Sequence, residues 1–116
     1  MAYQDGPDPR SVVVAFNDRI NARDLAGLTD LMTEDHTFVD PAGAVVRGRA
    51  ACTAAWRGFF AAFTDYRNVF AAVVADGDTV TVIGRSTCSE PALAGPARWT
   101  ATVRDGKVAC WQVTDA

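Results

Sequence analysis

The stretch NVFAAVVADGDTVTVIGRSTC, residues 68–88, decides the fold class. Within it, two runs rich in Val and Thr, residues 69–75 and 79–88, flank the sequence DGD at residues 76–78. Runs of this composition around a glycine-containing turn are typical of a β-hairpin. The stretch therefore predicts two neighbouring antiparallel strands.

The chain continues in the same pattern towards its end. After a loop with Pro and Gly at residues 89–96, two more runs, 97–104 and 107–114, flank Asp105-Gly106. Turns and loops of this kind join neighbouring antiparallel strands. We therefore predict a four-stranded antiparallel meander in the second half of the chain.

The first half of the chain predicts three helices. Asp8-Pro9 is a typical helix start, and apolar residues then recur at three- and four-residue steps as far as Ile20. A second, shorter helix is expected after Asp24. The third contains the heaviest apolar stripe of the chain, made of Cys52, Trp56, Phe59, Phe60 and Phe63. Helices followed by strands predict an α+β fold in which helices cover one face of a curved antiparallel sheet.

A short strand is expected between the second and third helices. Residues 36–40 read HTFVD, and Thr33-Glu34-Asp35 breaks the apolar pattern before them. The sequence Asp40-Pro41-Ala42-Gly43 has the residue preferences of a type I turn. We therefore expect a hairpin between this strand and residues 44–46.

Composition and charge narrow the classes of function. The chain has 116 residues, so we expect one domain at residues 9–116 behind a disordered tail at residues 1–8. Its formal net charge of −3 gives no field to hold nucleic acid or an anionic membrane. Three widely spaced cysteines and one histidine favour neither a metal site nor a disulfide scaffold. The absence of a leader or an apolar spanning run favours a cytoplasmic protein.

Four short segments carry a resemblance to a known superfamily. They read NARDL at residues 21–25, FVDPAG at 38–43, GRAA at 48–51 and RDGKV at 104–108. With the order of the elements, they resemble the nuclear-transport-factor-2-like superfamily, in particular its SnoaL-like polyketide cyclase and ketosteroid isomerase branches. The resemblance implies a cone-shaped sheet wrapped around a long helix, with two further N-terminal helices. It also implies an apolar pocket at the open end of the cone.

Asp40 is the leading candidate for a catalytic group. If Phe38 faces the core, strand alternation places His36 and Asp40 on that same face. A carboxylate in an apolar cavity is a stronger general base than one in water. The base of ketosteroid isomerases lies in a similar Asp-Pro-x-Gly segment, so the resemblance assigns this role to Asp40. The alternative is that Asp40 only opens the turn and binds the backbone through its side chain.

Two more residues are candidates for acid and base chemistry. Asp115 shares an alternating face with Trp111 and Val113 and could supply a second carboxylate; its place near the chain end also fits a frayed terminus. His36 could move protons near neutral pH, because the reference pKa of histidine is about 6.5. The alternative for His36 is a structural role at the start of a strand.

Aromatic residues at helix and strand spacing are candidates to line the pocket. The predicted substrate-binding set is Phe16, Trp56, Phe60, Tyr66, Trp99 and Trp111. The same residues could instead fill the core. The resemblance places the donor tyrosine of the isomerases on Phe16 and their protonated acid on Trp99 or Thr100, and Phe16 and Trp99 cannot replace those groups. Tyr66 or an indole N–H would then have to stabilise an enolate.

These observations predict a cofactor-independent enzyme that transfers protons on an enolisable carbonyl substrate, as a polyketide cyclase or isomerase does. Its ligand would be an apolar or polycyclic small molecule. One alternative is a non-catalytic binding or dimerisation module. Another is water addition as in limonene epoxide hydrolases, with Asp40 and Asp115 as the carboxylates. The Arg-x-Asp segment of those enzymes resembles Arg85-Ser86-Thr87, which lacks the acid.

The predicted sheet also offers a surface for a partner. Val80, Val82 and Ile83 place apolar side chains on both faces of one strand. Sheets of the superfamily that the chain resembles commonly pack against a twin. A homodimer through the sheet is therefore expected.

Overall fold

The computed structural model describes residues 8–115, and the predicted tail at residues 1–8 lies outside this part except for Asp8. Three α-helices, one short 3-10 helix and six strands make up the described chain. In order they are α1 (Pro9–Ala22), α2 (Leu25–Asp30), β1 (Met32–Val39), β2 (Val45–Arg47), α3 (Arg49–Ala62), β3 (Arg67–Asp76), β4 (Thr79–Thr87), η1 (Pro91–Leu93), β5 (Gly95–Arg104) and β6 (Lys107–Asp115). The α+β class, the three helices and the meander are confirmed.

The six strands form one curved sheet in the order β2-β1-β6-β5-β4-β3. Neighbouring strands are antiparallel with one exception, because β1 runs parallel to β6. The prediction of a wholly antiparallel sheet is therefore wrong at this pair. Parallel neighbours need a long crossover between them, and here most of the chain separates β1 from β6. No local turn signal could have revealed this pairing.

Strand β1 also begins earlier than predicted. Thr33-Glu34-Asp35 belongs to the strand rather than interrupting it. Met32 is fully buried and pairs with Val108, and the register to β6 then shifts before Thr37. Such an irregularity lets a strand turn polar side chains to solvent without ending the ladder. The expected hairpin to residues 44–46 is confirmed as the antiparallel pairing of β1 and β2.

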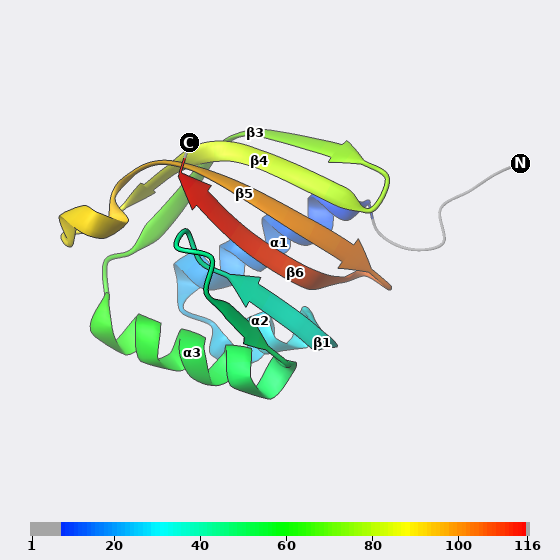
Figure 1. The fold of residues 1–116 in the computed structure, drawn as a ribbon, viewed down its shortest axis with the longest axis horizontal. Coiled ribbons are helices and arrows are strands. Elements are labelled where there is room, and N and C mark those ends of the chain that lie inside the picture. The colour runs from blue at the N-terminus through cyan, green and yellow to red at the C-terminus, as the bar shows by residue number, and fades with distance from the viewer. Residues whose placement is uncertain (1–7, 116) are drawn as a thin grey trace, which may run out of the picture.

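Helix α1 fills the hollow of the sheet. Asp8 caps it by accepting a hydrogen bond from the backbone of Arg10, Pro9 occupies the first turn, and the helix ends where Arg23 takes left-handed backbone angles. Its buried face contains Phe16 and Ile20. In Figure 1 the long strands β3 to β6 arch over α1, while α3 lies on the other side of the opening near β1. Helix α3 packs against β1 and β2 at one side of the sheet and against α2.

The curvature of the sheet depends on a close backbone approach at Gly84. Gly84 in β4 pairs with Phe70 in β3, and the register between the two strands then shifts by one residue. A β-carbon at position 84 would lie 2.1 Å from the carbonyl oxygen of Val69. The strands can therefore approach this closely only because residue 84 has no side chain.

The outer face of the sheet exposes several large apolar side chains. Val69, Val74 and Ile83 are 49%, 62% and 39% exposed. Val80 and Val82 are fully buried on the inner side, so this strand has apolar side chains on both faces, as predicted. Strand alternation explains the difference, because Ile83 follows Val82 and must point to the opposite face. Among residues 8–115, no helix is long and apolar enough to span a membrane.

Candidate functional site

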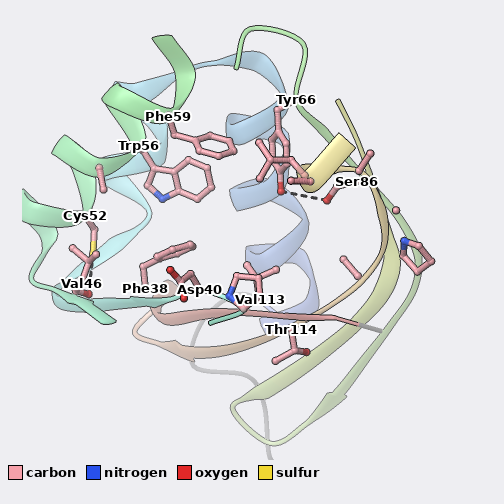
Figure 2. Close-up of a pocket in the computed structure, with 18 residues that line it drawn as sticks. Phe38, Asp40, Val46, Cys52, Trp56, Phe59, Tyr66, Ser86, Val113 and Thr114 are labelled. Carbon is pink, nitrogen blue, oxygen red and sulfur yellow. Dashed lines mark hydrogen bonds between the residues drawn. The ribbon is translucent and has the colours of Figure 1, made fainter. Parts of the chain in front are cut away.

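A cavity of about 390 Å³ opens between α3 and the inner face of the sheet. Helix α3, strands β1, β4, β5 and β6, and the segment around η1 contribute to its walls. Figure 2 shows the side chains of α3 and those of the sheet pointing towards one another across it. Most of the exposed wall is apolar. This volume is in the usual range for a small-molecule site.

One wall is a continuous series of aromatic rings. The ring centroid of Trp56 lies 5.8 Å from that of Phe38 and 5.6 Å from that of Phe59. The ring of Phe59 in turn meets Tyr66 edge to face at 4.8 Å. All four residues line the cavity. Rings in such contact hold one another in place and present a stiff apolar surface to a ligand.

Asp40 lines the cavity at the end of β1, beside Phe38 and Val113 (Figure 2). The residue as a whole is partly exposed, and its Oδ1 accepts hydrogen bonds of 2.9 Å from the backbone N–H groups of Ala42 and Ala44. The predicted turn is present, with a 2.9 Å bond from Gly43 N–H to the Asp40 carbonyl. Within residues 8–115, Oδ2 accepts no hydrogen bond. The turn thus holds one of the two carboxylate oxygens by hydrogen bonds.

A hydroxyl pair lies on the side of the cavity opposite Asp40 (Figure 2). The Tyr66 hydroxyl is 3.3 Å from Oγ of Ser86, and Ser86 donates a 2.8 Å hydrogen bond to Oδ1 of Asn68. All three side chains are buried. Burial raises the pKa of the Tyr66 phenol, although its hydrogen bond to Ser86 opposes this. Tyr66 therefore remains a protonated, neutral donor at physiological pH.

Helix α1 anchors the hydroxyl pair from behind. Asn21 donates a 2.9 Å hydrogen bond to the carbonyl of Asn68 and accepts one of 2.9 Å from its N–H. Asn17 donates a further bond to the same carbonyl at 3.3 Å. These bonds fix β3 beside α1. Ser86 in β4 and Asn68 in β3 therefore lie on paired strands, while Tyr66 lies in the connection just before β3.

His36, a predicted catalytic residue, does not line the cavity. Its side chain is fully buried, its Nδ1 lies 2.6 Å from the carbonyl oxygen of Val108, and its ring packs against Phe16 at 5.7 Å. Burial lowers the pKa of His36, while the Val108 carbonyl and the charge of Asp35 act in the opposite direction. The neutral imidazole joins β1 to β6. His36 therefore has a structural role, which is the alternative to catalysis that the sequence left open.

His36 should make the stability of the protein dependent on pH. Because the pKa of His36 is lower in the folded than in the unfolded chain, the unfolded state binds more protons below the ordinary value of 6.5. The free energy of unfolding should therefore fall as the pH drops from about 7 to about 5. Denaturant unfolding across this range measures the slope.

The control for this dependence is His36→Asn, because the chain has one histidine. Three carboxylates have pKa values lowered from the ordinary 3.8, namely Asp8, Asp35 and Asp65. Their contribution to stability is lost only below the pH range of this experiment. The variant should show a flat profile between pH 7 and 5. If the free energy of unfolding of His36→Asn changed with pH as steeply as that of wild type, His36 would not be the source of the pH dependence.

The other predicted residues divide between core and cavity. Trp56 and Tyr66 line the cavity, together with Asp40. Phe16, Trp99 and Trp111 are fully buried in the core and do not belong to the cavity wall. Phe60 packs against Trp56 at 5.5 Å and carries the Arg23 guanidinium over its ring, also outside the wall. The side chain of Asp115 lies outside the described residues.

Sequence reasoning did not identify Ser86 or the segment of residues 92–97, both of which line the cavity. A signal for Ser86 was available, because it follows Val80, Val82 and Gly84 in the inward register of β4 and is the polar member of that series. The segment around η1 carried no such signal. Its position depends on Glu90, whose side chain accepts from the N–H of Ala92 and begins the helical turn.

Neither a metal site nor a reactive thiol is built into the described part of the chain. Residues 8–115 contain no group of three or more His, Cys, Asp or Glu side chains that could hold a metal ion. Cys52 lines the cavity, but burial raises the pKa of its thiol. The Cys52 thiol instead donates to the carbonyl of Val46 at 3.4 Å. The polar groups that remain in the cavity wall are the Asp40 carboxylate, the hydroxyls of Tyr66, Ser86 and Thr114, and the indole N–H of Trp56.

The curved α+β architecture is similar to that of an NTF2-like protein from Cytophaga hutchinsonii, with a TM-score of 0.78 at 17% identity. The family model described as SnoaL-like domain matches residues 13–111, and the chain belongs to this family. No curated protein matches the chain.

Solved structures share the fold at low sequence identity. A proposed polyketide cyclase from Sinorhizobium meliloti has a TM-score of 0.81 at 21% identity, with 90% of this chain and 94% of that chain covered. A proposed ketosteroid isomerase from Kribbella flavida has a TM-score of 0.80 at 20% identity, covering 91% and 76%. TerC, crystallised with polyporic acid, has a TM-score of 0.80 at 19% identity, covering 94% and 92%. At these identities the likeness establishes the fold alone.

Proposed function

We propose that the protein is a cofactor-independent enzyme that transfers a proton on an enolisable carbonyl substrate inside this cavity. The observation that carries the proposal is the placement of a free carboxylate oxygen of Asp40 opposite the hydroxyls of Tyr66 and Ser86, across an apolar cavity. Proton removal next to a carbonyl requires a base and, separately, a donor for the oxygen that becomes negative. The cavity has one of each on facing walls.

The proposed step uses these groups in fixed roles. Oδ2 of Asp40 takes a proton from the carbon next to the carbonyl, and the electron pair of that C–H bond forms the enolate. The negative charge thereby moves from Asp40 to the carbonyl oxygen, which accepts a hydrogen bond from Tyr66 when the Tyr66 O–H turns from Ser86 to the substrate. Return of the proton to another carbon gives isomerisation; attack of the enolate carbon on a second carbonyl gives aldol-type cyclisation. The aromatic wall at Trp56 holds a flat substrate between the Asp40 carboxylate and the Tyr66 hydroxyl.

Structures of the same fold support a small-molecule ligand. TerC was crystallised with polyporic acid, and a protein with a ketosteroid isomerase-like fold from Catenulispora acidiphila was solved in complex with trimethylamine. For this chain the aromatic wall and the volume of the cavity favour an apolar ligand of modest size.

A second candidate function is ligand binding without catalysis. It is favoured by the two backbone hydrogen bonds to Asp40, because a turn alone would also select an aspartate there. Water addition of the epoxide hydrolase type has less support. Arg85, whose segment resembles that of the hydrolases, is exposed and does not line the cavity.

The experiment that tests the donor role is the replacement Tyr66→Phe. Uptake of solvent deuterium next to the carbonyl of cyclic ketones and polyketide-like diketones, followed by NMR, measures the proton transfer. Loss of one donor to the developing oxyanion should reduce kcat about 100-fold and change KM little. The ring contact of residue 66 with Phe59 is preserved in the variant, so its thermal unfolding serves as the control. An exchange rate within about twofold of wild type would contradict the role of Tyr66.

We also propose that the protein forms a homodimer through the outer face of the sheet. Its exposed apolar residues Val69, Val74 and Ile83 come from the neighbouring strands β3 and β4, and exposed apolar patches of this kind mark interaction sites. Light scattering should report about twice the chain mass of 12.4 kDa. Val74→Lys should shift the mass towards that of one chain. If light scattering gave the mass of a single chain for the wild-type protein at all concentrations, the proposal of a homodimer would be wrong.

A further inference from the structure

The charge of the cavity is not balanced by the protein. The three ion pairs within residues 8–115 involve Asp8, Asp24 and Asp35, so Asp40 has no cationic partner there. Of the side chains that line the cavity, none belongs to Arg, Lys or His. Two backbone N–H groups of the turn bind the Asp40 carboxylate, but no cation of the cavity wall balances its charge. A ligand could supply that charge.

The aromatic wall favours the same kind of ligand. Trp56, Phe38 and Phe59 form contacting rings on the cavity wall that includes Asp40. The face of an aromatic ring attracts a cation, most strongly for tryptophan. A carboxylate beside such rings is the arrangement that binds an organic ammonium ion. The same carboxylate repels an anion that has the shape of that ammonium ion.

We propose that the ligand carries a positively charged nitrogen, as a protonated amine on an apolar body, and that this nitrogen pairs with Asp40. The inference deepens the proposed function, on which it rests, because it defines the substrate as an amine-bearing carbonyl compound. Phosphorylated and carboxylated ligands are excluded by the same charge. The apolar body lies along the wall at Trp56, and the carbonyl oxygen points to Tyr66.

A cationic substrate also stabilises the product of the proton transfer. When Oδ2 of Asp40 takes the proton from carbon, Asp40 becomes a neutral acid and the substrate becomes a zwitterion of ammonium and enolate. The ammonium stabilises the enolate by attraction within the same molecule. On the opposite wall the enolate oxygen can accept a hydrogen bond from Tyr66, whereas Ser86 donates to Asn68, so this internal charge adds to a small set of protein donors.

Three probes of equal shape and different charge test the inference by isothermal titration calorimetry at pH 7. They are 2-naphthylmethylamine, a cation; 2-naphthylmethanol, which is neutral; and 2-naphthoate, an anion. Wild type should bind the amine about tenfold more tightly than the alcohol, and the carboxylate more weakly than both. Asp40→Asn should bring the amine and the alcohol within about twofold of each other.

The control variant is Asp105→Asn, which changes the net charge by the same amount. Asp105 lies in the turn between β5 and β6 with a φ of 56°, a conformation that asparagine tolerates, and it does not line the cavity. This variant should retain the tenfold preference for the amine.

Equal binding of the amine and the alcohol by wild type would overturn the inference and leave the proposed function in place. A preference that survives in Asp40→Asn would also overturn it. If none of the three probes bound, both the cationic-ligand inference and the proposed function would be overturned, because the cavity would then not be a ligand site. A preference for the amine without any proton exchange on bound ketones would support the inference and reject the catalytic proposal.

Discussion

Asp40→Asn lowers the rate of proton exchange by about 10² to 10⁴-fold, the usual contribution of a positioned general base. The amide has the shape of the carboxylate but cannot take a proton. Its carbonyl oxygen can still accept the two hydrogen bonds from Ala42 and Ala44, so the turn and the fold should persist. Deuterium uptake by NMR measures the rate, and thermal unfolding checks the fold.

The size of the effect separates the two roles of Asp40. A residue that only opens the turn would be replaced by asparagine with almost no change, because asparagine is also favoured in such turns. A residue that accepts the proton would lose the reaction while the melting temperature stays near that of wild type. An exchange rate within about threefold of wild type in Asp40→Asn would reject Asp40 as the base.

Gly84→Ala has the largest expected effect on stability. A methyl group at position 84 would lie 2.1 Å from the carbonyl oxygen of Val69, and the backbone of Phe70 is also within 3.1 Å. These are backbone atoms of the paired strand, so the clash is relieved only by moving β3 away from β4. We expect a loss of about 3–5 kcal/mol in the free energy of unfolding. Denaturant unfolding monitored by tryptophan fluorescence measures it.

The matched control is Gly58→Ala in α3. A β-carbon at Gly58 meets no atom within 4 Å, and the residue is exposed in the middle of a helix. This variant should gain about 0.5–1 kcal/mol, because alanine favours the helix. If both variants lost the same stability, the effect at Gly84 would reflect the loss of glycine in general rather than the close approach of two strands.

The local pattern of the sequence was sufficient for most elements of the fold. Asp8 and Pro9 marked the start of α1, and turns with aspartate and glycine marked the ends of the long strands. Each of these signals lies within a few residues of the element it defines. The parallel pairing of β1 with β6 has no such signal, since it joins Phe38 to Trp111 through contacts that form only in the folded chain.

The candidate site was predictable in part for the same reason. Alternation from Phe38 placed Asp40 on the inner face correctly, because strand geometry is local. Alternation could not separate the aromatic residues of the cavity wall from those of the core. Trp56 and Trp99 are both buried, but Trp56 lines the cavity, whereas Trp99 packs against Phe70 in the core. Strand and helix periodicity cannot distinguish these two environments.

The most direct test of the account is deuterium uptake by the wild-type protein from heavy water into a panel of cyclic ketones, amino ketones and diketones. We predict saturable uptake at the carbon next to the carbonyl, and competitive inhibition by 2-naphthylmethylamine, because substrate and probe share the cavity at Asp40. Uptake at the rate of buffer alone, for every ketone that calorimetry shows to be bound, would contradict proton transfer by Asp40 and leave a binding protein.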